Sequence, residues 1–345
     1  MKLSKIAAAV LSLTLMCGAV PFNSAVVNDS AVFAEEEAEY TKGTYGVLTY
    51  RNYGDYIEIS DCDTSATEVE IPSGIDGVSV TSIGDWAFSD CDVMTTITIP
   101  DSVASIGDMA FTDCGAMATI TIPDSVTSIG ASAFFSCTSL TSITIPDSVT
   151  SIGDYAFYAC YALTSITIPD SVTGIGKAAF YYCEALTSIT IPDSVISIGD
   201  SAFWGCSALT SITIKNPNCM IADSSNTISD AYGRFTGTIY GYDNSTAQAY
   251  AEKYGYKFES LGEYVETILG DIDGDGVINS SDASNVLTAY ALIATGGDSP
   301  FTDEQMKAAD VNNDGAVDSS DASSILAYYA YTATGGTGTL EEFLG

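Results

Sequence analysis

The sequence predicts a β-rich solenoid of 23-residue coils, followed by a small all-α module. Two observations predict this architecture. Prolines and cysteines recur with a period of 23 residues, at Pro100, Pro123, Pro146, Pro169 and Pro192 and at Cys91, Cys114, Cys137, Cys160, Cys183 and Cys206. A fixed period of roughly 20 to 29 residues is typical of stacked coils. Further on, an acidic 12-residue loop followed by an amphipathic segment occurs twice, from Asp271 and from Asp310.

The N-terminus has the pattern of a secretory signal peptide. Lys2 and Lys5 form a short basic region before an apolar run over residues 6–16, which is too short to span a bilayer. Small residues at Val32 and Ala34 then precede an acidic run. We therefore predict a signal peptide over residues 1–34, cleaved after Ala34, and an extracellular mature chain. The alternative, lipoprotein processing at Cys17, is disfavoured by the bulky Met16 before it.

A repeat domain with a cap at each end is expected over residues 40–261. The segments 45–50 and 56–60 around Asn52-Tyr53-Gly54-Asp55 predict a β-hairpin at its start. The segment 245–254, followed by Gly255, predicts a helix at its end. Caps of this kind shield the open ends of a solenoid.

Each coil is expected to begin with a short strand. Alternation along one such strand places Ile166 and Ile168 inward and Ser165 and Thr167 outward. The proline that follows ends the pairing of the strand. The glycine of each Ile-Gly pair, such as Gly153, suits a bend where a Cβ atom would clash.

The coils resemble a known family of repeats. The motif Ile-Pro-x-x-Val-x-x-Ile-Gly-x-x-Ala-Phe-x-x-Cys occurs intact over residues 145–160 and recurs in other copies. It resembles the BspA-like leucine-rich repeat of secreted bacterial surface proteins, over about residues 40–260. The resemblance implies a curved or slightly twisted leucine-rich-repeat solenoid that serves adhesion and protein contacts.

Three columns of equivalent residues run along the predicted solenoid. The six cysteines play the same part in every coil, so we interpret them as buried free thiols. The threonines Thr98, Thr121, Thr144, Thr167, Thr190 and Thr213 are interpreted as strand residues of good β propensity. Candidate partner-binding residues form an aromatic column of Phe135, Tyr158, Tyr181 and Trp204. These rings either bind sugar faces or partner side chains, or cover the apolar side of the coil beneath them.

The two acidic loops have the ligand pattern of a calcium site. Oxygen ligands stand at loop positions 1, 3, 5, 9 and 12, a carbonyl at position 7 and Gly at position 6. The first loop offers Asp271, Asp273, Asp275, the Val277 carbonyl, Asn279 and Asp282. The second offers Asp310, Asn312, Asp314, the Ala316 carbonyl, Asp318 and Asp321. Because the same pattern occurs twice in register, we predict two calcium ions.

Helices follow both loops. We expect them over 282–294 and 321–333, each ended by Ala-Thr-Gly-Gly, with a short helix between them opened by the capping box Thr302 to Gln305. This duplicated loop and helix resembles a type I dockerin over about residues 264–345. The resemblance implies calcium-dependent docking into a cohesin of a scaffoldin, through loop positions 10 and 11 and the helix after them. Those positions are Ser280, Ser281, Ser319 and Ser320.

Charge excludes several classes of function. The chain has 10 Lys and Arg against 45 Asp and Glu, with no His and a formal net charge of −35. Nucleic-acid binding needs basic groups that neutralise phosphates, so no nucleic-acid partner is expected. Without His, His-ligated zinc, Ser-His-Asp triads and Cys-His dyads are excluded. No segment after the signal peptide reaches the roughly 18 apolar residues of a membrane helix, so no membrane insertion is expected.

The leading hypothesis is a non-catalytic extracellular component of a cellulosome at the cell surface. Its dockerin binds a cohesin, and its solenoid contacts a protein, a cell surface or a polysaccharide during plant polysaccharide breakdown. The alternatives are a glycoside hydrolase or esterase carried as cargo, or an inhibitor or regulator of the enzymes of the complex. A glycosidase needs two carboxylates that converge across a cleft. The acids of the solenoid are mainly one repeated turn residue, Asp101, Asp124, Asp147, Asp170 and Asp193.

Overall fold

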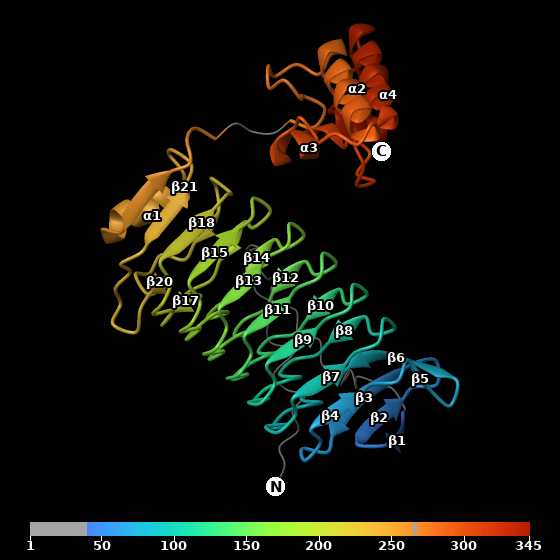
Figure 1. Cartoon of the computed structure of the whole chain (residues 1–345), viewed down its shortest axis with the longest axis vertical. Coiled ribbons are helices and arrows are strands. Elements are labelled where there is room, and N and C mark those ends of the chain that lie inside the picture. The colour runs from blue at the N-terminus through green and yellow to red at the C-terminus, as the bar shows by residue number, and fades with distance from the viewer. Residues whose placement is uncertain (1–39, 265–267) are drawn as a thin grey trace, which may run out of the picture. The chain divides into compact units, whose positions relative to one another are not determined.

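The computed structural model describes residues 40–264 and 268–345 (Figure 1). The predicted signal peptide lies outside these residues. The described residues form two separate hydrophobic cores, one reaching from Leu48 to Ala251 and the other from Ile272 to Leu340. The repeat region and the C-terminal module are therefore described one after the other.

The solenoid begins with the predicted hairpin and one further strand. β2 (Leu48–Asn52) pairs antiparallel with β3 (Ile57–Cys62), which confirms the hairpin with shifted bounds. An additional strand that the sequence did not predict, β1 (Thr41–Tyr45), pairs with the other edge of β2 across a turn at Gly46, with φ 58°. β5 (Gly74–Ile75) and β6 (Val78–Ile83) follow, and β6 pairs parallel with β3.

The coils stack into two rows of parallel strands. One row lies on the face toward the viewer in Figure 1 and consists of β4 (Glu68–Glu70), β7 (Thr96–Thr98), β9 (Thr119–Thr121), β11 (Ser142–Thr144), β13 (Ser165–Thr167), β15 (Ser188–Ile191), β18 (Ser211–Ile214), β21 (Thr238–Gly241) and β22 (Lys257–Ser260). The other consists of β6 with β8 (Ser105–Ile106), β10 (Ser128–Ile129), β12 (Ser151–Ile152), β14 (Gly174–Ile175), β16 (Ser197–Ile198) and β19 (Met220–Ile221). β17 (Phe203–Trp204) pairs with β20 (Ile228–Ser229). In the central coils, from β9 to β18, paired residues lie 23 positions apart, as in Ile143 with Ile166.

Inward side chains fill the solenoid as the alternation predicts. Ile166 and Ile168 are buried, whereas Ser165 and Thr167 are exposed. Behind the strands lies a column of buried phenylalanines whose ring centroids stand 5.2 to 5.5 Å apart, made of Phe88, Phe111, Phe134, Phe157, Phe180 and Phe203. Each coil thus covers the apolar side chains of the next.

Close packing between coils explains the repeated glycine and cysteine. A Cβ atom at Gly130 would lie 2.5 Å from the backbone nitrogen of Asp108 in the preceding coil. The thiol of Cys160 donates a hydrogen bond to the carbonyl of Phe134 at 3.2 Å, and its equivalents in neighbouring coils do the same. The cysteines of the described residues are free and buried, as predicted. Burial raises the pKa of the Cys160 thiol to about 12.

A helix lies where the sequence predicts one, at the end of the repeat region. Helix α1 (Thr246–Tyr254) begins after Ser245, whose hydroxyl accepts a hydrogen bond from the backbone N–H of Gln248. It ends at Gly255, which adopts the left-handed conformation with φ 70°. Strand β22 follows α1 and completes the first row.

The C-terminal module contains four described helices. They are α2 (Ser280–Ala294), α3 (Asp303–Ala309), α4 (Ser319–Ala333) and α5 (Leu340–Leu344), and α2 packs along α4 (Figure 1). α2 and α4 begin two residues before the predicted starts, because Asn279 and Asp318 act as N-caps. Asp282 and Asp321, taken as the first helical residues, are the acidic partners of these capping boxes.

Candidate functional site

The first acidic loop is held in a tight ring by its own backbone. The carboxylate of Asp271 accepts hydrogen bonds from the N–H groups of Gly274, Asp275 and Gly276 at 2.8 to 3.1 Å. The left-handed Gly274 and Gly276 turn the chain around this carboxylate. Oxygen atoms of Asp271, Asp273 and Asp275 consequently lie within 4.8 Å of one another. This brings together the predicted ligands at loop positions 1, 3 and 5.

The second loop repeats this geometry with the same number of carboxylates in a different arrangement. The carboxylate of Asp310 accepts hydrogen bonds from the N–H groups of Asp314 and Gly315 at 3.1 and 2.9 Å. Asn313 and Gly315 take the left-handed positions. Asn312 stands where the first loop has an acid, so an amide oxygen replaces a carboxylate at position 3. At position 9 the exchange is reversed, because Asp318 stands where the first loop has Asn279. Each loop therefore carries four acids, and the two share their fold.

The acid at position 12 closes each loop. Asp282 is fully buried, and its carboxylate accepts hydrogen bonds from the N–H groups of Ile272 and Asn279 at 2.8 Å. Asp321 is placed in the same way by the N–H groups of Val311 and Asp318. Burial raises the pKa of the Asp321 carboxyl, because desolvation disfavours its charged form.

The donor set of both loops fits a hard divalent cation. All predicted ligands are carboxylate, amide or backbone oxygens, which are the ligands that calcium takes in flexible loops of this length. In the first loop, the Nδ2 atom of Asn279 donates to the Val277 carbonyl at 2.9 Å, so these two predicted ligands lie together. A cation among the clustered Asp271, Asp273 and Asp275 would also relieve their mutual repulsion.

The predicted docking serines lie at the starts of equivalent helices. Ser280 and Ser281 are the first two residues of α2, Ser319 and Ser320 are the first two of α4, and all four are exposed. The Ser320 hydroxyl accepts a hydrogen bond from Asn312 at 2.8 Å. In the first loop, Asp273 occupies the position of Asn312 and has no donor to offer.

Matched apolar residues continue from these serines along both helices. Leu287 and Tyr290 on α2 are 43% and 39% exposed, and their counterparts Leu326 and Tyr329 on α4 are 42% and 41% exposed. The members of each pair are 39 residues apart, which is also the distance between the two loops. The module therefore presents the same side chains twice.

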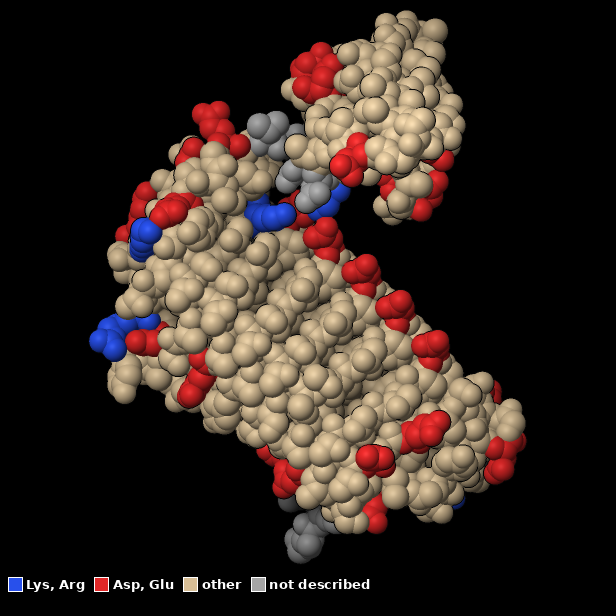
Figure 2. Space-filling model, in the orientation of Figure 1, with Lys and Arg blue, Asp and Glu red and all other residues tan. Residues whose placement is uncertain are grey.

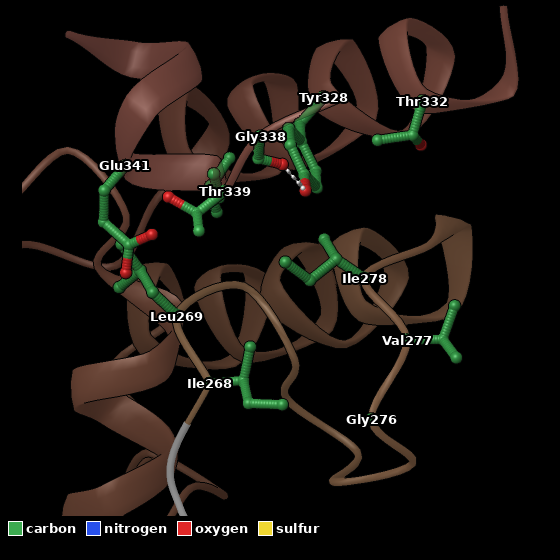
Figure 3. Close-up of a pocket in the computed structure, with 11 residues that line it drawn as sticks. Ile268, Leu269, Gly276, Val277, Ile278, Tyr328, Thr332, Gly338, Thr339 and Glu341 are labelled. Atoms are coloured by element: carbon green, nitrogen blue, oxygen red, sulfur yellow. Dashed lines mark hydrogen bonds between the residues drawn. The ribbon is translucent and has the colours of Figure 1, made fainter. Parts of the chain in front are cut away.

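A groove lies between the first loop and the C-terminal segment (Figure 3). It has a volume of about 520 Å³, with Ile268, Leu269 and Ile278 on one side and Tyr328 on the other, and Leu340 also lines it. The Tyr328 hydroxyl donates to the Gly338 carbonyl at 2.8 Å, which holds the C-terminal segment against α4.

The C-terminal residues pack only partly as the sequence suggested. The sequence suggests a terminal clasp in which Leu340, Phe343 and Leu344 pack on Val265, Ile268 and Leu269. Val265 lies outside the described residues. Leu340 is buried in the same core as Leu269. Phe343 instead contacts the rings of Tyr328 and Tyr331, at 5.7 and 5.1 Å, and Leu344 is exposed. The packing differs from the expected one because α5 places Phe343 against rings of α4.

The aromatic column of the solenoid forms a continuous stack. Ring centroids of Phe135, Tyr158, Tyr181 and Trp204 follow one another at 4.6, 4.7 and 4.5 Å, with interplanar angles of 2°, 7° and 23°. All four side chains are half-buried. The two inner rings therefore have both faces covered by their neighbours, and only their edges are free for a partner. This stacking could not be read from the spacing of the residues.

The threonine column is exposed at Thr98, Thr121, Thr144, Thr167 and Thr190, on the outer side of the first row of strands. Figure 2 shows that the part of this face in view carries few charged side chains, whereas a row of acidic ones follows one edge. Among the helices that the structure describes, none is long and apolar enough to cross a bilayer.

Comparisons with known proteins assign the repeat region and the C-terminal module to known families. The family described as BspA type leucine rich repeat region matches in six copies over residues 60–185 and 127–227, and the dockerin type I domain matches residues 269–328. No curated protein matches. Both families are non-catalytic kinds of domain, and the comparisons reveal no catalytic domain.

Solved structures include similar repeats. A leucine-rich repeat protein of T. pallidum is 27% identical, with a TM-score of 0.50, and the match covers 65% of this chain and 100% of that one. A leucine-rich cell surface protein of Faecalibacterium prausnitzii is 22% identical, covering 66% and 95% of the two chains, with a TM-score of 0.35. One from Bacteroides ovatus is 23% identical, covering 66% and 78%, with a TM-score of 0.32.

The two family matches agree with the stacked coils and the paired loops. Dockerin domains imply a cohesin partner and cellulosome-type assembly, and leucine-rich repeats imply protein binding. The chain therefore joins a BspA-type leucine-rich repeat region to a C-terminal type I dockerin domain.

Proposed function

We propose that this chain is a non-catalytic, exported component of a cellulosome, which its dockerin attaches to a scaffoldin cohesin in a calcium-dependent way. Its solenoid then brings a protein, a cell surface or a plant polysaccharide to the complex. The observation that carries the proposal is the pair of acidic loops with matching geometry, each followed by a helix with the same exposed side chains.

Calcium binding would stabilise the folded C-terminal module. Each loop binds one ion through the residues at positions 1, 3, 5, 7, 9 and 12. The ion neutralises the carboxylates that crowd each loop, so its binding free energy adds to the folding free energy of the module. Cohesin binding then depends on calcium because the docking helices α2 and α4 start directly from the loops.

The duplicated face supports two docking orientations. Ser280 and Ser281 with Leu287 and Tyr290 form one half of the face, and their counterparts on α4 form the other. A cohesin that recognises one half can turn around and bind the other in the same way. Recognition relies on Ser, Leu and Tyr, because Lys307 is the only basic residue of the module.

The aromatic column is the proposed partner-binding feature of the solenoid. Because its inner rings are stacked on each other, it offers ring edges and the hydroxyls of Tyr158 and Tyr181. Such a surface suits a protein side chain better than the stacking of a sugar ring, because stacking requires an open aromatic face.

Binding to cohesins tests the proposal. The full chain is mixed with a panel of scaffoldin cohesins, and complexes are detected on native gels with calcium or with a chelator. We expect a complex with at least one cohesin in calcium only. A complex that persists in chelator, or none with any cohesin, would contradict the proposal.

Variants test the two orientations. Leu287→Ala with Tyr290→Ala should leave binding through α4 intact, and Leu326→Ala with Tyr329→Ala should leave binding through α2 intact. The quadruple variant should lose binding. If either double variant alone abolishes the complex, the face acts in a single orientation.

A further inference from the structure

The first row of strands presents two columns of hydroxyl side chains to solvent. One column is Thr96, Thr119, Ser142, Ser165, Ser188 and Ser211, and the other is Thr98, Thr121, Thr144, Thr167, Thr190 and Thr213. We call these twelve residues the hydroxyl face. Every one of them is Ser or Thr, in a chain that carries 45 acidic residues. If β propensity alone determined these positions, Val, Ile, Tyr and Phe would also be expected there.

The hydroxyls of this face are free to bond outward. Within the described residues, only Thr96 has a hydrogen-bond contact, with the neighbouring Thr95 at 3.5 Å. The adjacent column behaves differently, because Thr141 and Thr164 donate to carbonyls of the preceding coil at 3.1 and 3.2 Å. The same residue type is therefore bound internally in one column and unpaired in the next two.

The hydroxyl face is rigid and periodic. Register pairing aligns Thr121 with Thr144, and Thr144 with Thr167. Neighbouring strands in such a ladder stand about 4.8 Å apart. The face therefore repeats a pair of hydroxyls at every coil, along a line parallel to the solenoid axis.

A shallow groove marks one part of this face. It has a volume of about 340 Å³ and is lined by Ser165, Thr167, Ser188 and Thr190, together with Asp170 and Lys215. Lys215 stands where the earlier coils have the proline that follows the strand. Four hydroxyls, a carboxylate and an ammonium group thus border one hollow, which offers both donors and acceptors.

The chemistry of the face selects among possible partners. Protein interfaces concentrate Tyr, Trp, Met and Arg at their centres and are depleted in Ser, and none of the four enriched types belongs to this face. A charged polymer would find no complementary charge in the two columns. A neutral polysaccharide carries hydroxyls that both donate and accept, and its repeating units suit a repeating surface.

We propose that the hydroxyl face binds the chains of an insoluble neutral β-glucan, laid along the solenoid axis and centred on the groove between β13 and β15. This proposal deepens the proposed function, because it assigns the polysaccharide role of the solenoid to a surface separate from the aromatic column. The proposal rests on that function only for the cellulosome context, because the hydroxyl face would bind glucan even without a cohesin.

The test uses the full chain with calcium, sedimented with insoluble cellulose. The variant carries Thr144→Val, Thr167→Val and Thr190→Val, which keeps side-chain shape and β propensity and removes only hydroxyls. The matched control carries Thr127→Val, Thr150→Val and Thr173→Val, at exposed positions outside the hydroxyl face. Three lost hydrogen bonds should weaken retention about tenfold or more. The control should bind within about twofold of the unsubstituted chain, because it keeps the hydroxyl face.

Several outcomes would overturn the proposal. One is a chain that cellulose does not retain, and another is equal retention of the chain and the face variant. Retention only by an acidic polysaccharide such as polygalacturonate would also refute it. Cohesin binding is measured on the same samples. Loss of cellulose binding with intact cohesin binding separates this proposal from the dockerin function, whose own failure would appear as absent cohesin binding in all samples.

Discussion

Replacing Asp282 by Asn tests whether the position-12 carboxylate holds the first loop together. The side chain is fully buried and accepts short hydrogen bonds from the N–H groups of Ile272 and Asn279, with a longer one from Asp273. Asn keeps the shape and one oxygen, but it turns an NH₂ group toward one of these donors. The variant therefore loses a charge-assisted bond and leaves a buried N–H without an acceptor.

The magnitude follows from these contacts. A hydrogen bond to a charged group contributes about 1.5 to 3 kcal/mol, and an unsatisfied buried group costs about 1 to 3 kcal/mol. The expected loss is therefore about 2.5 to 6 kcal/mol. A domain the size of residues 268–345 has a free energy of unfolding of about 4 to 12 kcal/mol in total. The substitution should therefore remove a large part of the free energy of unfolding and lower the melting temperature by at least about 10 °C.

The assay is thermal unfolding of the full chain with calcium, followed by the helical far-ultraviolet circular dichroism signal. All four described helices of the C-terminal module contribute to this signal, and α1 of the solenoid serves as an internal reference. Asp298→Asn, an exposed acid in the same module, is the matched control and should melt like the unsubstituted chain. A melting temperature of Asp282→Asn equal to that of the control would refute the reasoning.

Three further predictions concern calcium, the C-terminal segment and the thiols. Chelation of the full chain should remove most of its helical signal and leave the β signal of the solenoid, because the empty loops hold repelling carboxylates; an unchanged helical signal would contradict this. Deletion of residues 338–345, or Leu340→Ala, should destabilise the module in calcium, by about 2 to 5 kcal/mol for the substitution, since Leu340 is buried; an equal effect of Leu344→Ala, at an exposed position, would argue against the packing. In the native chain, Cys160 and Cys206 should resist alkylation at mildly alkaline pH and react after denaturation, because burial raises the pKa of each thiol to about 12; rapid native labelling, measured by mass spectrometry, would disprove their burial.

Periodic features of this protein were predictable because they repeat locally. The 23-residue spacing places each coil position against its equivalent, so the inward Ile166 and the free, buried Cys160 followed from the pattern. The loops were predictable for the same reason, since each ligand pattern lies within 12 consecutive residues. Strand β1 was not predicted because its residues do not alternate between apolar and polar. It is a strand because it pairs with β2.

Contacts between separated side chains needed the tertiary structure. The sequence places Phe135, Tyr158, Tyr181 and Trp204 in one column, but the packing of the coils decides that the rings stack face to face. The same holds for Phe343, which turns to Tyr328 and Tyr331 and away from the first loop.

The amino-acid pattern alone thus determines the solenoid, the paired acidic loops and the helices that follow them, because each depends on residues at fixed local spacing. The tertiary structure decides which groups remain free to act. The Thr141 hydroxyl bonds to the coil before it, while the hydroxyl of Thr144, three residues later, is exposed and unpaired. Pairing or exposure depends on the position of the adjacent coil, and the separation of residues along the chain does not encode that position.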